Sequence, residues 1–482
     1  MSSEKRSKNR QNRASTTRTY KVVAWLCSFL FLALIGYIIY FQIFQSKNIL
    51  NNKYNTRLQE AAEKVSRGSI LARDGQVLAE TVRDQNGEET RNYPFNSLFA
   101  HPVGYASYGG SGLEAAESTT LLTSHSNIVT QFENELNEEK KQGDNVVTTL
   151  DVKLQTAARD ALGSYKGTVL AMDSSTGDIL CDYSAPGFDP NTLEENWDSL
   201  TQSTDGNFIN RSLQGLYPPG STFKLITALT YLREHGTFDD FSYNCTGSEE
   251  YEGFSIHCVH GEVHGQESFA DAMANSCNCA FAHMALNDID KDDLRATAES
   301  MGFNKKELKT DLPYEQSIFT LDSSTPGQLT MQTAIGQGDT RATPMQMLLV
   351  ADAAANGGKA MNPNFITSVQ SSEGTAVQSA SRTPYGQLMT SEEAEALKGL
   401  MKEVVKRGTA SRQLSDLPYN IAGKTGTAEH TDEAGGKAHS WFVGFSDTGY
   451  NDIAVCVLVE DGDLDLTGAY VARQLFTSWF GG

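Results

Sequence analysis

Residues 217–224 read YPPGSTFK, so a serine stands three residues before a lysine and directly behind two prolines and a glycine. Proline cannot continue an earlier helix, but its fixed φ suits the first turn of a new one. The stretch therefore predicts a helix that begins near Ser221 and brings Lys224 beside the serine, one turn away. The helix dipole and the free amide N–H groups of such a start favour developing negative charge.

This pair supplies a nucleophile and a base. A serine hydroxyl attacks a carbonyl at neutral pH only if a neighbouring group takes its proton. Lys224 can do so only when it is neutral, and this requires that burial and polar neighbours depress the pKa of its amine. The sequence thus predicts a buried Lys224 next to Ser221.

A second motif, Ser276-Cys277-Asn278, follows about fifty residues later. We expect Ser276 to relay a proton between Lys224 and a leaving amine, and Asn278 to hydrogen-bond both that lysine and a substrate amide. Cys277, in the middle of the motif, receives no role.

The third motif is Lys424-Thr425-Gly426, followed by Thr427. Lys424, Thr425 and Thr427 offer a cation and hydroxyls to a substrate carboxylate, and Gly426 lets a peptide backbone lie close to the strand. The amides of Ser221 and Thr427 are expected to form an oxyanion hole. Each motif alone is also compatible with a helix cap, a solvated lysine or a strand turn, but the three in this order favour an acylating serine.

The segments around these motifs predict an α+β fold. Asp151 is expected to cap a helix, and residues 167–184 read as a hairpin with its turn at Ser174–Gly177. Strands early and late in the chain, with helices between them, imply one sheet that joins distant ends. The helices are expected near 221–235, 267–287, 291–301, 326–335, 344–356, 391–407 and 468–480, and the late strands at 421–429, 439–446 and 452–460.

Charge and hydropathy divide the chain. Residues 1–21 hold seven Lys and Arg against one Glu, a net +6, which leaves −27 for the remainder of a chain with net charge −21. Residues 22–44 are apolar and uncharged, long enough to cross a bilayer, and no Ala-x-Ala site follows them, so an uncleaved anchor is favoured over a signal peptide. We therefore divide the chain into a tail (1–21), an anchor (22–44), a front domain (45–147) and a catalytic domain (148–482). The positive-inside rule predicts that the tail is cytoplasmic and that both domains are extracytoplasmic. The acidic body lacks the basic patch that nucleic-acid binding requires.

Two of the seven cysteines, Cys245 and Cys258, bracket a polar insert that is followed by His260 and His264. The simplest interpretation leaves both thiols unpaired. A disulfide is an alternative outside the membrane, and a zinc ion held by Cys245, Cys258 and His264 is another. A fourth ligand would then come from His257, His260 or an acid. The other cysteines, Cys27, Cys181, Cys277, Cys279 and Cys456, are interpreted as packing residues.

Taken together, these motifs resemble those of class B, monofunctional penicillin-binding proteins. The resemblance extends to GKTGTAE at residues 423–429, to Gly336-Gln337-Gly338, and to RGSILARDG at 67–75 and SGLE at 111–114 in the front domain. It covers roughly residues 54–482. The family's fold is an antiparallel sheet packed with helices, here behind a single membrane helix and a small front domain.

The resemblance implies a peptidoglycan D,D-transpeptidase. Ser221 would attack the penultimate D-Ala of a stem peptide ending in D-Ala-D-Ala, and β-lactams would trap the same serine. No cofactor is implied. The front domain is too short for a glycosyltransferase, so a separate membrane glycan polymerase of the SEDS type is the implied partner.

Two alternatives remain at this point. A serine β-lactamase shares the first chemical steps, but the only Glu-x-x-Leu-Asn-like match of class A enzymes is Glu133–Asn137, which precedes Ser221. The second alternative is a β-lactam sensor or a catalytically quiet scaffold for the division machinery. A sensor would need a signalling domain.

Overall fold

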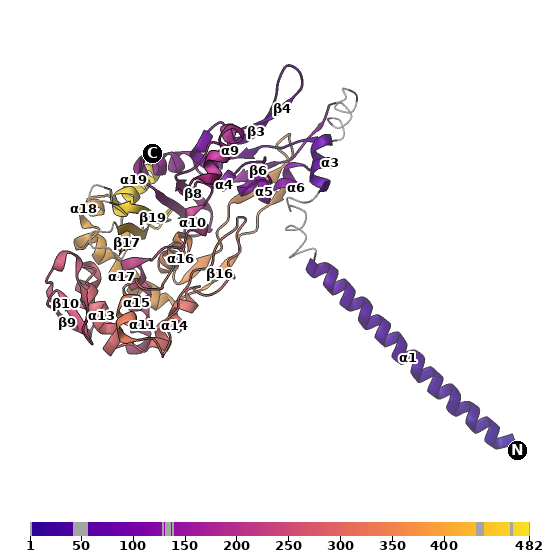
Figure 1. The fold of residues 1–482 in the computed structure, drawn as a ribbon. Helices are drawn as coiled ribbons and strands as arrows, with labels where there is room; N and C mark the ends of the chain where they lie inside the picture. The colour runs from indigo at the N-terminus through magenta and orange to yellow at the C-terminus, as the bar shows by residue number, and fades with distance from the viewer. Residues whose placement is uncertain are drawn as a thin grey trace. The chain divides into compact units, whose positions relative to one another are not determined.

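The computed structural model describes residues 2–41, 56–127, 139–429, 438–462 and 466–481, together with Thr130 and Leu136. The chain divides into two compact units, Met1–Glu60 and Ala61–Gly482 (Figure 1). All three sequence motifs lie in the second unit.

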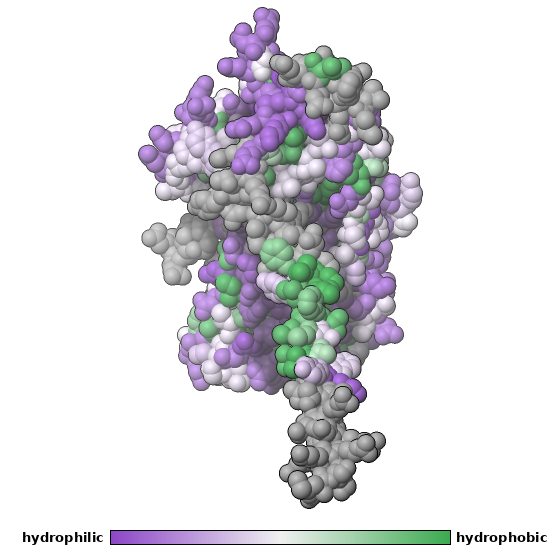
Figure 2. Space-filling view, turned by 90° about the vertical axis from the view of Figure 1, so that its right-hand side faces the viewer, coloured by the Kyte–Doolittle hydropathy of each residue, from purple (hydrophilic) through white to green (hydrophobic). Residues whose placement is uncertain are grey.

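The first unit contains the long helix α1 (Ser2–Tyr40). Within it, Tyr20–Tyr40 is a stretch of 21 residues with a mean hydropathy of 2.5, long and apolar enough to cross a membrane. Figure 2 shows its exposed apolar side chains as a green column. The predicted anchor, residues 22–44, overlaps this stretch, and residues 42–44 lie outside the described part of the chain.

An antiparallel sheet of five strands, in the order β17-β18-β19-β7-β8, is the core of the second unit. The prediction that one sheet joins distant ends of the chain is confirmed, because β19 pairs with β7. Every residue of β19 from Ile453 to Val459 is buried, so both faces of the sheet are covered. The strands are β17 (Ile421–Glu429), β18 (Ala438–Ser446), β19 (Ile453–Gly462), β7 (Gly167–Asp173) and β8 (Ile179–Ala185).

Helices cover this sheet. Asp151 caps α8 (Val152–Leu162) as predicted, since its carboxylate accepts a hydrogen bond from the Leu154 amide at 3.0 Å. The helix α8 packs against α19 (Gly468–Phe480), and both contact the sheet. The helix α16 (Pro344–Ala355) contacts β18 and β19.

The remaining predicted helices are also present. The segment expected to be helical over 267–287 is divided into α12 (Phe269–Ala274) and α13 (Asn278–Asn287), because Ser276 adopts a left-handed φ of 55° between them. The others are α11 (Lys224–His235), α14 (Lys291–Ser300), α15 (Gly327–Ala334) and α17 (Ser391–Arg407).

The polar insert between α11 and α12 folds into two small antiparallel strand pairs, one enclosed by the other in the sequence. In one, β9 (Ser242–Cys245) pairs with β12 (Gly265–Ser268), and in the other β10 (Ser248–Tyr251) pairs with β11 (Phe254–His257). A short 3₁₀ turn, η5 (Val259–Gly261), joins them. The insert therefore ends directly at α12, close to the second motif.

A six-stranded sheet of order β15-β14-β6-β2-β3-β4 forms the front part. Gly75 has a φ of 86° in the turn that joins β2 to β3. Two of its strands, β14 and β15, come from a much later part of the chain than the other four. The sequence did not indicate that these two strands join the front sheet. The strands are β15 (Ala376–Ser379), β14 (Ile366–Gln370), β6 (Asn145–Thr148), β2 (Ile70–Leu71), β3 (Val77–Arg83) and β4 (Glu89–Asn92).

Several shorter elements complete the described chain, and one further prediction falls partly outside it. The Glu133–Asn137 match includes residues that lie outside the described part. The shorter elements are α3 (Thr56–Lys64), η2 (Asn96–Phe99), α4 (Ala100–Val103), α5 (Gly112–Ala116), α6 (Ser118–Leu121), η3 (Pro190–Thr192), α9 (Leu193–Gln202), α10 (Arg211–Gln214), α18 (Ser411–Leu414), and the strand pairs β1 (Val65–Ser66) with β5 (Lys141–Gln142) and β13 (Lys359–Met361) with β16 (Pro384–Gln387).

A buried carboxylate ties the front part together. Glu114, at 0% exposure, accepts hydrogen bonds from Arg67 Nε and Arg91 Nε, both at 2.6 Å. Burial alone would raise the pKa of Glu114, but the two guanidinium groups outweigh it and lower that pKa. Arg67 and Glu114 belong to the segments RGSILARDG and SGLE, so this contact explains why both segments carry those residues.

We expect Glu114→Gln to lower the free energy of unfolding by about 3 kcal/mol, because the substitution leaves two buried guanidinium groups without their countercharge. Glu89→Gln is the matched control, since Glu89 pairs with Arg83 and Lys140, whose side chains are 36% and 37% exposed, and exposed pairs contribute about 1 kcal/mol or less each. Thermal unfolding of the two variants measures the difference. Equal melting temperatures would contradict a structural role for the buried cluster.

Candidate active site

Ser221 lies in a tight 3₁₀ turn, η4 (Gly220–Phe223), directly before α11. Gly220 has a φ of 54°, and a Cβ atom there would come within 2.5 Å of the Thr427 carbonyl oxygen. The Gly220 amide also donates to the Gly336 carbonyl at 2.9 Å. Only glycine fits at position 220, and the turn is therefore held between β17 and the Gly336 loop.

The residues before this turn are anchored to the central sheet. Trp441 Nε1 on β18 donates to the Pro218 carbonyl at 3.1 Å. The Tyr217 hydroxyl donates to Glu460 Oε1 at 2.7 Å, and the same oxygen accepts from Arg211 Nε at 2.8 Å. These contacts fix the position of YPPGSTFK before any substrate is bound.

Lys224 is fully buried at the first turn of α11. Its Nζ atom donates to the Ser276 carbonyl and to Asn278 Oδ1, each at 2.7 Å, and lies 3.3 Å from Ser276 Oγ. The predicted contact between Asn278 and this lysine is thus present. Asn278 Nδ2 also donates to the His257 carbonyl at 3.0 Å, which fixes the orientation of the amide.

Ser276 connects two lysines. Its hydroxyl oxygen accepts a hydrogen bond from Lys424 Nζ at 2.7 Å in addition to its contact with Lys224. Lys424 is also fully buried, and it donates to the Thr425 carbonyl at 2.9 Å. The left-handed backbone of Ser276 is the feature that turns its side chain toward both amines.

Burial changes the titration of both amines. It lowers the pKa of Lys224 to about 8, against the opposing influence of neighbouring cysteine and carboxylate groups. Burial and then the charge of Lys224 lower the pKa of Lys424 well below its ordinary value. Two amines that share one hydroxyl cannot both be charged without repulsion, so a neutral amine is available in this site near neutral pH.

The third motif lies on β17, which among the described strands is an edge strand paired with β18. The Thr427 carbonyl faces η4, and in a strand the N–H and C=O groups of one residue point to the same side, so the Thr427 amide also faces Ser221. A Cβ atom at Gly426 would approach Thr222 Cγ2 to 3.0 Å, so glycine here permits the close packing of strand and turn. The Thr427 side chain is exposed beside them.

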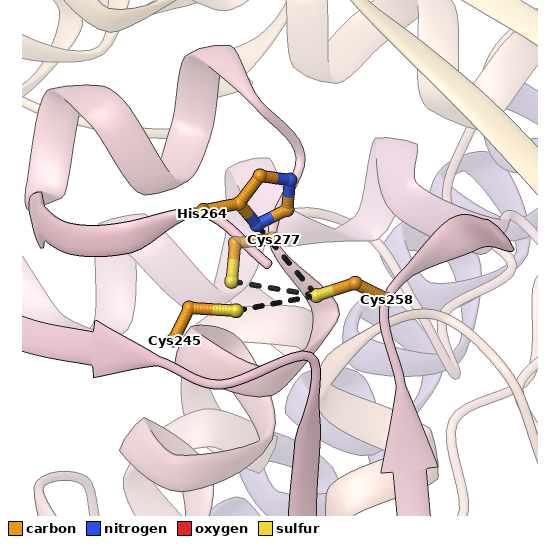
Figure 3. Close-up of side chains that lie close together, drawn as sticks. All are labelled: Cys245, Cys258, His264 and Cys277. Atoms are coloured by element: carbon orange, nitrogen blue, oxygen red, sulfur yellow. Dashed lines mark hydrogen bonds between the residues drawn. The ribbon is translucent and has the colours of Figure 1, made fainter. Parts of the chain in front are cut away.

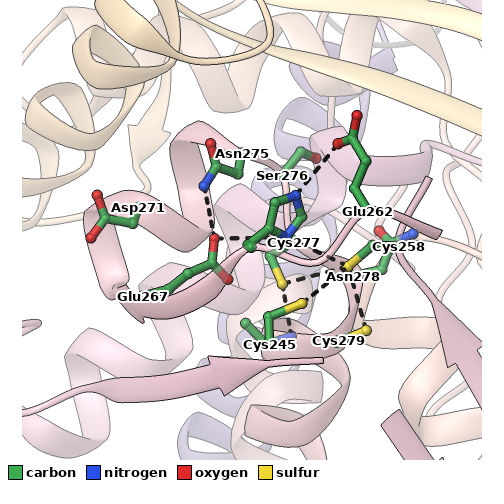
Figure 4. Close-up of polar contacts among 12 residues, drawn as sticks. Cys245, Cys258, Glu262, Glu267, Asp271, Asn275, Ser276, Cys277, Asn278 and Cys279 are labelled. Atoms are coloured by element: carbon green, nitrogen blue, oxygen red, sulfur yellow. Dashed lines mark hydrogen bonds and ion pairs between the residues drawn. The ribbon is translucent and has the colours of Figure 1, made fainter. Parts of the chain in front are cut away.

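The structure thus brings the three motifs to one place, but two residues of this region were not foreseen. Thr409, before α18, shares a hydrogen bond with the Thr425 hydroxyl. Cys277 is buried in a group of sulfur atoms and does not serve packing alone (Figures 3 and 4). Nothing in the sequence indicates that Thr409 belongs to the site. For Cys277, its position between Ser276 and Asn278 is a signal of this kind.

Comparisons with known proteins agree with this geometry. The family described as "Penicillin binding protein transpeptidase domain" matches residues 167–480, and "Penicillin binding protein A dimerisation domain" matches residues 67–146. The chain is 30% identical over 463 residues to a peptidoglycan D,D-transpeptidase of Mycolicibacterium smegmatis, covering 90% of this chain and 92% of the relative.

Solved structures lead to the same class. Penicillin-binding protein A from Mycobacterium tuberculosis, in a ceftriaxone acyl-enzyme complex, superposes with a TM-score of 0.79 at 28% identity, covering 88% of this chain and all of that one. A D,D-transpeptidase domain from Eggerthella lenta gives a TM-score of 0.77 at 30% identity, covering 87% and 99%. The fold and the site define a serine acyltransferase, and the chain belongs to the class B penicillin-binding proteins, as its motifs predicted.

We expect the rate of acylation by a β-lactam to rise with pH through a midpoint near 8, because the pKa of Lys224 is lowered to about 8 and only its neutral form accepts the serine proton. Below the midpoint the rate constant should fall about tenfold for each pH unit. Rapid mixing with a fluorescent penicillin over a pH series measures this profile. A rate that does not change across neutral pH would exclude Lys224 as the base.

Proposed function

We propose that this protein is a membrane-anchored peptidoglycan D,D-transpeptidase that works through an acyl-enzyme on Ser221. The observation that carries the proposal is the continuous chain of contacts from Lys224 through Ser276 to Lys424, beside the serine. The names of the relatives support a transpeptidase over a β-lactamase or a quiet scaffold.

In the proposed acylation, Lys224 takes the proton of Ser221 as the serine oxygen bonds to the carbonyl carbon of the penultimate D-Ala. The tetrahedral intermediate then expels the terminal D-Ala, whose nitrogen receives a proton that Ser276 relays from Lys224. An amine from a neighbouring stem peptide attacks the ester, loses its proton through the same groups, and releases Ser221. Asn278 fixes Lys224 and offers its amide to the substrate.

The oxyanion hole in this proposal consists of the Ser221 and Thr427 amides. The former lies at the start of η4 and α11, where the helix dipole favours negative charge, and the latter faces η4 from β17. Fixed amide donors stabilise the negative oxygen of the tetrahedral intermediate more than they stabilise the ground-state carbonyl. The narrow gap that Gly220 and Gly426 allow keeps the two amides close.

We propose that Lys424, Thr425 and Thr427 recognise the terminal carboxylate of the substrate. Because burial holds the pKa of Lys424 low, an arriving carboxylate would raise it and attract a proton to this amine. Substrate binding and the charge of Lys424 are then linked. A β-lactam carries a similar carboxylate, and its ring-opened amine stays attached, so the acyl-enzyme persists.

The arrangement in the cell is part of the same proposal. Residues 1–21 form a cytoplasmic tail, residues 22–44 the anchor, and the front domain (45–147) and catalytic domain (148–482) lie outside the membrane. The apolar stretch Tyr20–Tyr40 and the seven basic residues at or before Lys21 support this orientation. Because the front domain (45–147) is too short for a glycosyltransferase, glycan strands would come from a separate membrane polymerase of the SEDS type.

We expect Ser221→Ala to abolish covalent labelling by benzylpenicillin, since the variant lacks the nucleophilic oxygen. Intact mass of the full-length protein, followed over time and mapped by peptide digestion, measures the adduct. Ser203→Ala, at the C-terminal cap of α9, is the control and should label like the parent protein. Persistent labelling of the Ser221 variant would refute the assignment.

We expect Lys424→Ala to slow acylation by about a hundredfold or more, because the carboxylate loses its cation and Ser276 loses a donor. Lys402→Ala, a lysine on α17 whose side chain is 41% exposed, is the matched control. The second-order acylation rate constants of both variants, with thermal unfolding to establish that each is folded, give the comparison. Equal rate constants in a folded Lys424 variant would remove this lysine from the site.

A further inference from the structure

Four side chains from four separate segments converge next to the second motif (Figure 3). Cys245 ends β9, Cys258 follows β11, His264 precedes β12, and Cys277 stands between α12 and α13. The three cysteines are buried, and only 12% of the His264 side chain is exposed. Their sulfur and nitrogen atoms all lie within 4.8 Å of one another. These four residues are called the thiol–imidazole cluster below.

Three of the six distances in this cluster match the edges of a tetrahedral zinc site. Cys258 Sγ lies 3.7 Å from Cys245 Sγ, 3.6 Å from Cys277 Sγ and 3.7 Å from His264 Nδ1. A zinc ion about 2.3 Å from each sulfur and about 2.0 Å from a nitrogen separates its tetrahedral ligand atoms by about 3.5–3.8 Å. The three distances from Cys258 therefore fit a four-coordinate zinc site, and the other three do not exceed 4.8 Å.

The same distances disfavour a disulfide. A bond between Cys245 and Cys258 would bring their sulfur atoms to about 2.0 Å, and the structure keeps both thiols free at 3.7 Å. Cys258 also has a third sulfur neighbour, because its Sγ donates to Cys279 Sγ at 3.4 Å. One disulfide could engage only two of these sulfur atoms and would leave the others crowded.

The groups around the cluster are suited to a cation (Figure 4). His264 directs Nδ1 toward the sulfur atoms, while its Nε2 atom lies 3.6 Å from Glu262 Oε2, an outer carboxylate of the kind that orients metal-binding histidines. Glu267 is buried at 1% exposure, with Oε1 3.8 Å from His264 Nδ1. Its Oε2 atom has no hydrogen-bond partner in the described part of the chain. The other carboxylate oxygen, Oε1, accepts a hydrogen bond from Asn275 Nδ2 at 2.9 Å.

We propose that Cys245, Cys258, His264 and Cys277 form a closed Cys₃His zinc site. Binding releases the three thiol protons to solvent and forms three Zn–S bonds and one Zn–N bond, with no change of oxidation state. Three thiolates and an imidazole in a tetrahedron select Zn²⁺ over the harder Mg²⁺ and Ca²⁺. All four positions are taken by protein ligands, so the ion is structural.

This site corrects two interpretations of the sequence. The fourth ligand is Cys277, whereas His257, His260 or an acid was expected. His257 and His260 are exposed and lie outside the cluster. Cys277 was interpreted as a packing residue, because nothing in the order of residues indicates that the second motif folds back onto the insert.

The position of Cys277 gives the ion a second consequence, which rests on the proposed function. Its neighbours Ser276 and Asn278 are the residues that bind Lys224. A bond from Cys277 to zinc would hold this loop, and with it the left-handed backbone of Ser276, against the insert. The cluster residues are therefore positioning residues that act through Ser276 and Asn278.

The first test is the metal content of the full-length protein, purified in detergent without chelators. We expect about one zinc per chain by elemental analysis, and far less in Cys245→Ser and His264→Ala. Cys181→Ser is the matched control, because Cys181 is a buried cysteine in β8 outside the cluster. Replacement of zinc by Co²⁺ should give the intense visible absorption of a tetrahedral cobalt–thiolate site, and that absorption should be missing in the two cluster variants.

The same protein gives the results that would overturn the proposal. Thiol titration after denaturation with chelator should find all seven cysteines, whereas a Cys245–Cys258 disulfide would leave two fewer. A parent protein without zinc that also fails to bind added Zn²⁺ or Co²⁺ would refute the site. Because these measurements need only the parent protein, they decide the question even if a variant does not fold.

The acylation rate tests the positioning role separately. Removal of zinc by a chelator should slow benzylpenicillin acylation at least tenfold, and added Zn²⁺ should restore it. A protein that loses and regains zinc with no change in rate would refute the link to Ser276 and leave the metal site standing. Failure of the proposed function is distinguishable, since Ser221 would then never be acylated, with or without zinc.

Discussion

Two buried amines, on Lys224 and Lys424, are both within hydrogen-bond distance of a single hydroxyl, that of Ser276. Desolvation of an amine is costly, and two charges at this spacing repel each other, so the surrounding structure must supply acceptors and leave one amine neutral. The Ser276 and Thr425 carbonyls and the Asn278 amide oxygen are those acceptors. The need to fix these acceptors explains why an edge strand, a 3₁₀ turn and the junction of two helices meet at one point.

Much of the local structure could be predicted because local chemistry determines it. Asp151 caps its helix, the prolines start a new one, and the apolar runs of β18 and β19 form buried strands. The roles suggested for Ser221 and Lys224 depend on a spacing of one helical turn. This spacing can be read from the sequence, because the two residues are three positions apart. The pairing of β14 and β15 with the front sheet could not be predicted, because the register of strands more than two hundred residues apart depends on the folded core.

The site was less predictable than the fold in one respect. Sequence order states which chemical groups are available, but not which of them share a hydrogen bond. The hydrogen bond between Thr409 and Thr425 joins a loop after α17 to an edge strand. Neither segment contains a motif that predicts this contact. Likewise, Cys277 could be assigned to a cluster only after the insert was seen to fold back on the second motif.

The thiol–imidazole cluster raises the question of why such a site would lie beside a catalytic motif. If it only filled space, small apolar side chains would pack equally well and would avoid the cost of burying the polar His264 imidazole. The insert is built of two short strand pairs, and isolated strand pairs of this size are at best marginally stable in water. A metal ion joins Cys245, Cys258 and His264 of the insert to Cys277 of the catalytic domain at a single point. The stability of the insert and the position of Ser276 would then depend on the same four bonds, which is a physical reason for a ligand to stand inside the motif itself.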